Sequence, residues 1–423
     1  MSFKKLIGKI HLWLGLSSGI IVLIISISGC LLAFEEEIKA LIFQYRQEVE
    51  VNENAPKKLL SENLHAAQLV AKDIPINRIE VVNERNRSYI FKRYTFVPDE
   101  EAGSFYWEDT EHYYEVFINP YTAEVVEAKD QTFGFSRFLV SLHIGLLLRH
   151  EVGTQIVGYS TLIFVIMLIT GLILWWPRNK KAFKVGTWFR WKSDTKWKRK
   201  NYDLHQIVGF YSMFLVIFIA LTGLMWAFTW FNDGVQWIVN GGDLPEKERQ
   251  IIESGADEAV LQQPLDIVYY ALQTRHPGAH RYHIGLPQDS LGTIGAFVDY
   301  KDNTRDAFLQ FDRYNGVLLQ TREKWEDKTN GEKLMAYNYD IHTGAIGGWV
   351  GKTIAFFLSL FSASLPITGF IIWWGRRNKN QGPGKMKISG KGQGNQLTNN
   401  PRPRLKHIDK KPASNQEEPV LKY

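Results

Sequence analysis

The chain contains a single cysteine, Cys30, among its 423 residues. One cysteine cannot provide a disulfide within the chain, a Cys-x-x-Cys redox pair or the Cys-x-x-Cys-His motif that attaches haem covalently. The glycine-rich stretch at residues 382–394 does not lie between a strand and a helix, so it is not a phosphate-binding loop. The 423-residue sequence also contains no recognisable flavin-binding or nicotinamide-binding domain. Any haem must therefore be bound non-covalently, and any electrons that enter from the cytoplasm must come from a separate reductase or a membrane quinol.

Charged residues are absent from the interiors of four long apolar runs, at residues 10–34, 156–176, 207–230 and 354–374. About 20 helical residues cross the roughly 30 Å hydrocarbon core of a bilayer, and each run reaches that length. The sequence therefore predicts an α-helical integral membrane protein with four principal transmembrane helices.

Lysine and arginine are distributed unevenly between these runs. Residues 178–204 hold ten Lys or Arg and two Asp, and further basic residues lie at 4–9 and 376–379. In contrast, residues 35–137 hold 20 acids and 12 bases, and residues 231–341 hold 18 acids and 11 bases. Because basic loops stay in the cytoplasm, we expect both termini inside and two acidic domains outside a bacterial cytoplasmic (inner) membrane. The net charge of +6 averages two compartments and does not indicate nucleic-acid binding.

The chain is expected to be an internal repeat of two parallel units. A shift of 194 positions aligns His11 with His205, and a shift of 198 aligns the Trp pairs at residues 175–176 and 373–374. Each unit has two spans, which return the chain to the same side, so the units are related by an axis along the membrane normal. Other aligned positions are Gly29 and Gly223, Thr170-Gly171 and Thr368-Gly369, and Arg178 and Arg376.

Each acidic domain is expected to be α+β, with one helix followed by four strands. The expected elements are a helix at 61–72 with strands at 78–82, 88–96, 113–118 and 124–128, and a helix at 264–275 with strands at 279–286, 292–300, 307–311 and 317–320. The expected segments are the N-terminus and first span (1–34), first outer domain (35–137), outer histidine segment and second span (138–178), basic loop (179–204), third span (205–230), second outer domain (231–341), outer histidine segment and fourth span (342–376) and a disordered basic tail (377–423).

Four histidines lie near the ends of the predicted spans. His11 and His205 begin outward-running spans near the cytoplasmic face, and His143 and His342 precede inward-running spans near the outer face. The symmetry axis would bring His11 opposite His205 and His143 opposite His342. Neutral imidazoles are good axial ligands for haem iron, so the sequence predicts two non-covalent haems, one near each face.

The outer pair requires an interrupted helix. Thirty-five residues separate His143 from Arg178, about 52 Å of continuous helix, so we expect a break around residues 149–153. Glycines at 344, 347, 348 and 351 predict a corresponding break in the second unit. His150 is an alternative outer ligand. The cations expected near haem propionates are Lys9, Lys200, Arg149 and Lys352.

Several motifs resemble one family of membrane proteins. They are Lys9-Ile-His11-Leu-Trp13-Leu-Gly15, Ser28-Gly29, Leu142-His143, Thr170-Gly171-Leu-Ile-Leu-Trp175-Trp176-Pro177-Arg178, Asp203-Leu-His205, His342-Thr-Gly344 and Thr368-Gly369-Phe-Ile-Ile-Trp373-Trp374. The chain resembles the PepSY-associated transmembrane helix family over nearly everything except the tail, and its outer domains look like PepSY modules.

The resemblance implies an activity as well as a fold. A branch of this family consists of inner-membrane siderophore reductases with two b-type haems. The implied function is reduction of ferric siderophores or other ferric chelates at the periplasmic face, which releases Fe(II) for iron acquisition. His11, His205, His143 and His342 would hold the haems. Some relatives carry a fused flavin reductase domain that these residues lack, so the expected donor is a cytoplasmic reductase or a membrane quinol. Membrane lipid is a further expected partner, and no nucleic acid is expected.

Two other functions are compatible with the segment order. One is a transporter of iron, siderophore or another solute, although the spans contain no interior charges and few polar side chains. The other is a membrane-anchored PepSY module that binds a peptide or protease without redox activity. The second alternative leaves the paired histidines unexplained.

Overall fold

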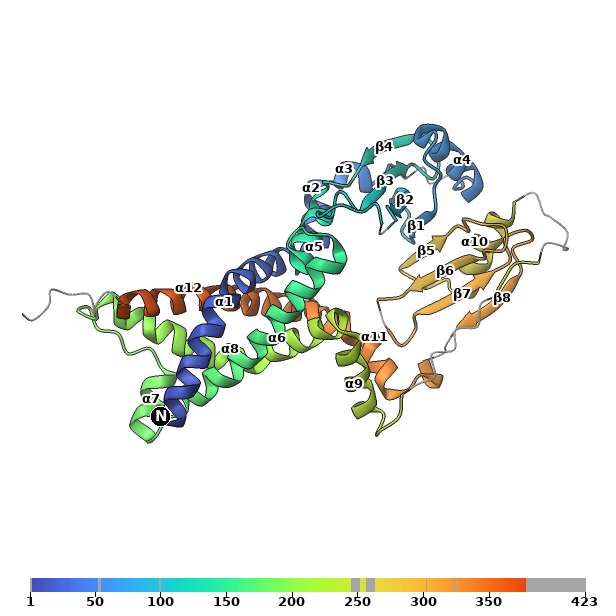
Figure 1. Cartoon of the computed structure of the whole chain (residues 1–423). Coiled ribbons are helices and arrows are strands. Elements are labelled where there is room, and N and C mark those ends of the chain that lie inside the picture. Colours follow the sequence, from blue (N-terminus) through green and yellow to red (C-terminus); the bar gives the residue numbers. More distant parts are fainter. Residues whose placement is uncertain are drawn as a thin grey trace, which may run out of the picture. The chain divides into compact units, whose positions relative to one another are not determined.

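Four helices in the computed structural model are long and apolar enough to cross a membrane. They are α1 (Phe3–Leu32), α6 (His150–Trp175), α8 (Trp197–Ala227) and α12 (Gly348–Arg377). Each packs against two neighbours, in the cyclic order α1, α6, α8, α12, so α1 lies across the bundle from α8 (Figure 1). The prediction of four spans is confirmed. The structure describes residues 2–51, 55–98, 100–244, 252–255, 263–301, 303–322 and 325–377, and the expected basic tail lies outside them apart from residue 377.

Shorter helices connect the spans to the rest of the chain. The third span ends three residues earlier than expected, because Phe228 is extended (φ −135°) and α9 (Thr229–Val239) begins a new direction. The others are α2 (Glu35–Ile42), α3 (Gln44–Gln47), α4 (Leu60–Ala71), α5 (Phe135–Gly145), α7 (Lys180–Thr187), α10 (Pro264–Arg275), α11 (Asn330–Thr343) and the 3₁₀ turns η1 (Trp325–Asp327) and η2 (Ala345–Gly347).

The eight strands of both acidic segments form a single antiparallel sheet, in the order β4-β3-β2-β1-β5-β6-β7-β8. The strands are β1 (Arg78–Val82), β2 (Tyr89–Phe96), β3 (Thr110–Ile118), β4 (Val125–Asp130), β5 (Arg281–Gly285), β6 (Ile294–Asp299), β7 (Ala307–Phe311) and β8 (Leu318–Arg322). Strands β1 and β5 join the two halves, with Ile79 opposite Ile284. The segments that sequence analysis treats as separate domains therefore share one sheet.

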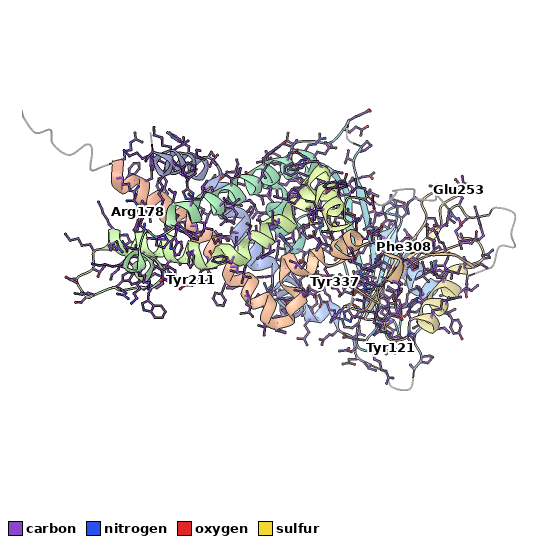
Figure 2. The ribbon with its side chains drawn as sticks, turned by 90° about the horizontal axis from the view of Figure 1, so that it is seen from below. Tyr121, Arg178, Tyr211, Glu253, Phe308 and Tyr337 are labelled. Carbon is purple, nitrogen blue, oxygen red and sulfur yellow. The ribbon has the colours of Figure 1, made fainter. Side chains whose placement is uncertain are left out.

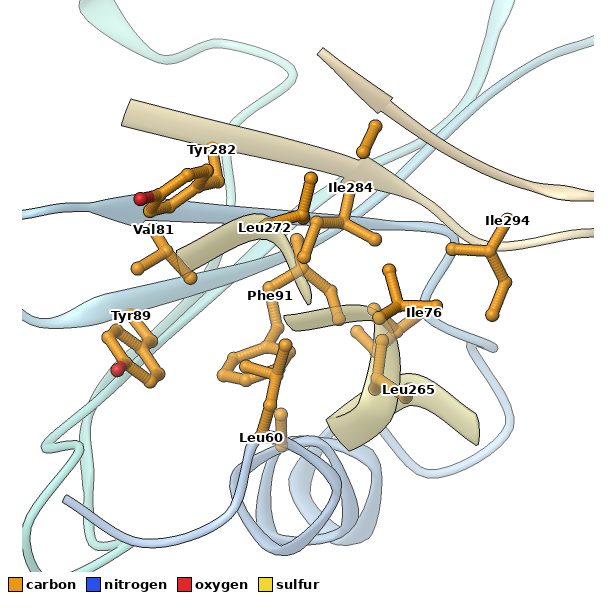
Figure 3. Packing of buried hydrophobic residues seen from close by; sticks show 14 of the residues in the cluster. Leu60, Ile76, Val81, Tyr89, Phe91, Leu265, Leu272, Tyr282, Ile284 and Ile294 are labelled. Carbon is orange, nitrogen blue, oxygen red and sulfur yellow. The ribbon is translucent and has the colours of Figure 1, made fainter. Parts of the chain in front are cut away.

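One face of the sheet packs on α4 and α10 through a common apolar core. Leu60 of α4 and Leu272 of α10 are buried with Phe91, Val81 and Ile284 of the strands (Figure 3). Because side chains alternate along a strand, Glu80, between the buried Ile79 and Val81, points to the opposite face. That opposite face carries a cluster of charges rather than a second apolar layer.

The charge cluster joins both halves of the sheet. The Nζ of Lys92 lies 2.7 Å from Glu80 and 3.2 Å from Glu115, and Arg281 of β5 lies 3.1 Å from Glu80. Burial alone would raise the pKa of the Glu80 carboxyl, but the charges of Lys92 and Arg281 outweigh it and lower that pKa to about 2. Burial would likewise lower the pKa of the Lys92 ammonium, and the two glutamates raise it instead.

Acid is therefore expected to weaken the sheet through Glu80. A carboxyl whose pKa is depressed by folding stabilises the fold above its unfolded pKa, and that contribution is lost as pH falls through the folded value. The contribution of Glu80, on the order of 3 kcal/mol, should be present above about pH 4.5 and decline toward pH 2. Denaturant unfolding of the detergent-solubilised chain at several pH values would measure it. Glu80→Gln should flatten this part of the profile, and an unchanged slope would contradict the assignment.

Candidate functional site

Two sharp corners carry the chain from the sheet back into the bundle. In the first, α5 ends at Gly145, Leu146 and Leu147 adopt left-handed conformations (φ 54° and 65°), and α6 begins at His150. The expected interruption is therefore present, but it begins at residue 146 rather than 149. A Cβ on Gly153 would collide with the backbone of Gly145, so two glycines permit this corner.

The second corner likewise combines a left-handed residue with a close pair of glycines. Helix α11 ends at Thr343, Gly344 is left-handed (φ 78°), and α12 begins at Gly348 (φ 55°). A Cβ on Gly344 would collide with the backbone of Gly351. The break predicted from these glycines is confirmed. Each corner leaves a histidine near the end of the preceding helix, His143 in α5 and His342 in α11.

The four predicted histidines form two ring pairs. The rings of His11 and His205 are 6.4 Å apart between centroids with planes at 83°, and those of His143 and His342 are 6.0 Å apart with planes at 69°. Two metal–nitrogen bonds of about 2.0 Å, plus roughly 1.1 Å from each nitrogen to its ring centre, give a separation of about 6.2 Å. Both pairs thus have the spacing of two imidazoles that share one metal ion.

The pairs lie at opposite ends of the bundle. His11 and His205 form the loop-end pair, near the end where α6 stops and α8 starts, and His143 and His342 form the sheet-end pair. Ser28, which contacts His143, follows His11 by 17 residues on α1. At 1.5 Å per residue, the two pairs are about 26 Å apart along the helix, most of a hydrocarbon core.

In the loop-end pair, a threonine hydroxyl fixes each ring. The Nδ1 atoms of His11 and His205 lie 2.9 Å from the Oγ1 atoms of Thr170 and Thr368, respectively. Each threonine hydroxyl also donates to a backbone carbonyl one turn earlier, Ile166 for Thr170. The hydroxyl oxygen can therefore accept a hydrogen bond from a protonated Nδ1, and in that tautomer Nε2 is unprotonated and available to a metal.

In the sheet-end pair, backbone carbonyls share this role. The Nδ1 of His143 lies 2.8 Å from the carbonyl of Ile25 and 3.2 Å from the hydroxyl of Ser28. The Nδ1 of His342 lies 3.0 Å from both the carbonyl of Ile219 and the hydroxyl of Thr222. Within the described part of the chain, the hydrogen bonds of all four rings run from Nδ1.

A glycine follows each of these hydroxyl residues and makes room for the ring. A Cβ on Gly29, Gly171, Gly223 or Gly369 would lie 3.1–3.4 Å from the Cε1 of the neighbouring histidine. A Ser/Thr-Gly dipeptide in each span thus supports one histidine. Every such histidine belongs to the same half of the chain as its dipeptide, whereas its ring partner belongs to the other half.

The sequence contained a signal for these supporting residues. Thr170-Gly171 aligns with Thr368-Gly369 in the repeat, although the alignment alone gives neither dipeptide a role. What the alignment could not supply was the contact between Thr170 and His11, 159 positions apart, or between Ser28 and His143, 115 positions apart.

A cavity of about 840 Å³ opens at the loop-end pair. This volume lies within the range of roughly 300–1,000 Å³ typical of small-molecule and cofactor pockets. Both His11 and His205 line it, together with Trp175 and Arg376. Its small lining residues are Gly8, Gly15, Gly19, Gly171, Gly209 and Gly369. The glycines leave space beside the two imidazoles, and most of the other lining residues are apolar, which suits an apolar planar ring.

The remaining predicted site residues lie elsewhere. His150 is exposed at the start of α6, where its ring is beside Thr154, and it is not part of the ring pair. Arg149 pairs with Glu151, and Lys352 pairs with Glu37 at 2.8 Å. The other two cations are outside the cavity lining: Lys9 is exposed, and Lys200 lies over the ring of Trp191.

The sheet-end pair has an aromatic neighbour on one side. The centroids of the Trp226 and His342 rings are 5.1 Å apart in an edge-to-face arrangement, and those of the Trp226 and Tyr339 rings are 6.5 Å apart. The position equivalent to Trp226 in the first half, 194 residues earlier, is Leu32. Trp226 and Tyr339 are 49% and 62% exposed, so a path of rings leads from His342 to the surface.

The sequence profile described as the PepSY-associated TM region matches residues 9–376. This range covers the second and third spans, all but the ends of the first and fourth, both corners and the whole sheet. No curated protein matches the chain significantly.

Proposed function

The chain belongs to the PepSY-associated TM region family, and from its two histidine pairs we propose that it conducts electrons across a membrane through two non-covalently bound b-type haems. The acceptors would be ferric siderophores or other ferric chelates at the periplasmic face, and the product would be Fe(II) for iron acquisition. The chain would be an oxidoreductase of the bacterial inner membrane, with both termini in the cytoplasm and the sheet outside.

The observation that carries this proposal is the spacing and orientation of the imidazoles. Each pair is 6.0–6.4 Å apart between ring centres, and the Nδ1 atoms are bound to hydroxyl or carbonyl oxygens. This combination fits bis-histidine haem ligation by Nε2. At the loop end, the glycine-lined cavity offers space for a flat ring. The sheet-end dipeptides repeat the same support around His143 and His342.

When bound, haem iron supplies reversible one-electron oxidation and reduction. His11 and His205 would hold the haem at the loop end, and His143 and His342 the one at the sheet end. Thr170, Thr368, Ser28 and Thr222 would orient those imidazoles and fix their tautomer. The apolar helices between the two sites would exclude water, and Arg376, which lines the loop-end cavity, is suited to balance a propionate. Trp226 and Tyr339 lie on the side from which an acceptor would approach.

Spectroscopy of the purified chain tests the proposal directly. The protein in detergent should show a Soret band and an α-band in reduced-minus-oxidised spectra. Anaerobic addition of ferric chelates to the reduced protein should reoxidise it, with Fe(II) appearing in a colorimetric ferrous assay. A chain without haem bands would refute the haem assignment. Haem that no ferric chelate reoxidises would refute the proposed acceptor.

A matched set of threonine variants tests the support of the loop-end pair. Thr368→Val removes the acceptor for the Nδ1 proton of His205, and loss of such a partner typically costs about 10–100-fold in metal affinity. We expect haem at this pair to dissociate at least about 10-fold faster, measured by transfer to an excess of apomyoglobin.

Thr368→Ser keeps the hydroxyl and should restore slow dissociation. Thr353→Val is the control, because the Thr353 hydroxyl binds only the Trp349 carbonyl on the exposed side of the same helix. Equal haem loss from the Thr368→Val and Thr353→Val proteins would show that the hydroxyl near His205 has no special role.

A further inference from the structure

The loop end of the bundle carries a strongly basic segment, residues 178–200. It holds ten Lys or Arg against a single acid, Asp194. Nine of the ten basic side chains are exposed. Helix α7 concentrates three of them, Lys180, Lys181 and Lys184. The field of this segment therefore favours an anionic partner.

Large aromatic side chains are exposed among these charges. Trp188 is 70% and Trp197 62% exposed, and Phe183, Phe189 and Trp191 are 40–49% exposed. Exposed indole rings next to lysines are costly in water but favourable at the boundary between lipid headgroups and acyl chains. The segment thus presents both features of an interfacial membrane surface, an apolar layer and cationic groups above it.

The segment cannot move far from the bundle. Trp175 of α6 donates its Nε1 proton to the carbonyl of Gly186 at 3.0 Å, and the hydroxyl of Tyr211 in α8 donates to the carbonyl of Thr187 at 3.1 Å. Figure 2 labels Tyr211 and Arg178 at this end of the bundle. Both ends of the segment continue into membrane spans, so its aromatic side chains are held at the level where the spans end.

We infer that residues 178–200 bind the headgroups of anionic phospholipids in the adjoining leaflet. Charge complementarity and continuity with two spans favour lipid over an acidic protein. A soluble partner would have to cover five exposed aromatic side chains that the headgroup region of the bilayer covers without any additional chain. The phosphate of the lipid would lie against α7, whose Lys180 and Lys184 are one turn apart on the same face.

The segment also contacts residues close to the loop-end pair. The Nε1 of Trp191 and the guanidinium of Arg199 both donate to the carboxylate of Asp203, two residues before His205. Anionic lipid is therefore expected to affect the environment of His205 through Asp203. That consequence depends on the proposed haem function, whereas lipid binding itself does not.

Lipid selectivity can be measured on the full chain reconstituted in phosphatidylcholine nanodiscs. Electron paramagnetic resonance of spin-labelled lipids gives the relative association constant of phosphatidylglycerol over phosphatidylcholine. One cation near an anionic surface contributes about a five-fold change in affinity, so we expect a selectivity of at least about five-fold at low salt. The triple variant Lys180→Gln, Lys181→Gln, Lys184→Gln keeps seven of the ten basic residues and should lower the selectivity at least about five-fold relative to the unchanged chain. The selectivity should persist in millimolar inorganic phosphate and fall at high ionic strength.

The matched control removes the same charge elsewhere. Lys58→Gln, Lys129→Gln and Lys301→Gln change three exposed lysines in the sheet region and should leave the lipid selectivity unchanged. Selectivity that is absent from the unchanged chain, or equal in the α7 triple variant, would overturn the inference. A third result would also overturn it: equal lipid selectivity in the unchanged chain and the α7 triple variant, combined with slower electron delivery from a soluble reductase to the triple variant. That result would assign the segment to an acidic protein partner. The lipid selectivity does not depend on haem content, so the lipid inference and the proposed haem function can fail separately.

Discussion

Purified His11→Ala and His205→Ala proteins are expected to retain about half of the haem bound by the unchanged chain. Each substitution removes one imidazole from the loop-end pair and leaves the sheet-end pair intact, about 26 Å away along α1. His143→Ala and His342→Ala should show the reverse pattern. The two groups of variants should therefore lose different components of the redox titration. Pyridine haemochrome assays give the stoichiometry, and potentiometric spectra identify which centre is lost.

His150→Ala is the matched control for the sheet-end pair. His150 precedes Glu151 at the start of α6 and is exposed, so its loss should leave both haem components in place. Loss of the sheet-end component in His150→Ala but not in His143→Ala would exchange their assignments. Equal loss of both components from all four pair variants would contradict the existence of two separate centres.

Gly344→Ala should release the sheet-end centre without touching either ligand. Gly344 is left-handed, which costs a residue with a Cβ roughly 1–2 kcal/mol, and its Cβ would also collide with the Gly351 backbone. The collision adds to that cost, because a backbone atom cannot move aside as a flexible side chain can. The corner must open, and opening it moves His342 at the end of α11 away from the carbonyl of Ile219. We expect loss of the sheet-end haem component and a thermal unfolding midpoint several degrees lower.

Gly347→Ala is the control in the same corner. Gly347 has no atom within 4 Å of its added Cβ and no positive φ. That variant should bind haem and unfold as the unchanged chain does. If the Gly344→Ala and Gly347→Ala proteins bind haem and unfold alike, the corner can accommodate a Cβ at residue 344, which would contradict the prediction.

The sequence alone predicted the elements much better than their partners. The four apolar runs, the helix at 264–275 and the strand at 307–311 occur where the periodicity and turn residues place them. Local signals of this kind are sufficient to locate a helix or strand, because the pattern of apolar residues within one element shows which of its side chains will be buried. The pairing of β1 with β5 had no local signal, since the two strands lie about 200 residues apart and either could have formed a sheet edge.

The histidine pairs were predictable because they follow from alignment and orientation, whereas the contacts between the histidines and their supporting hydroxyls were not. Which hydroxyl meets which imidazole depends on how α5 and α11 return into the bundle. The position of the first corner was misjudged because Leu146 and Leu147, rather than a glycine, adopt the left-handed conformation. Leucine rarely does so, and tertiary packing must impose that backbone.

The continuous sheet has a consequence for movement. Alternating-access transport swings one repeat unit against the other about a central site. Here the halves share the ladder between β1 and β5, the apolar core beneath it and the ion pair between Arg281 and Glu80. A swing large enough to admit a solute would have to strain or break that joint, whereas electrons pass between fixed centres without it. The shared sheet thus restricts movement of one half relative to the other, which suits electron transfer better than solute transport.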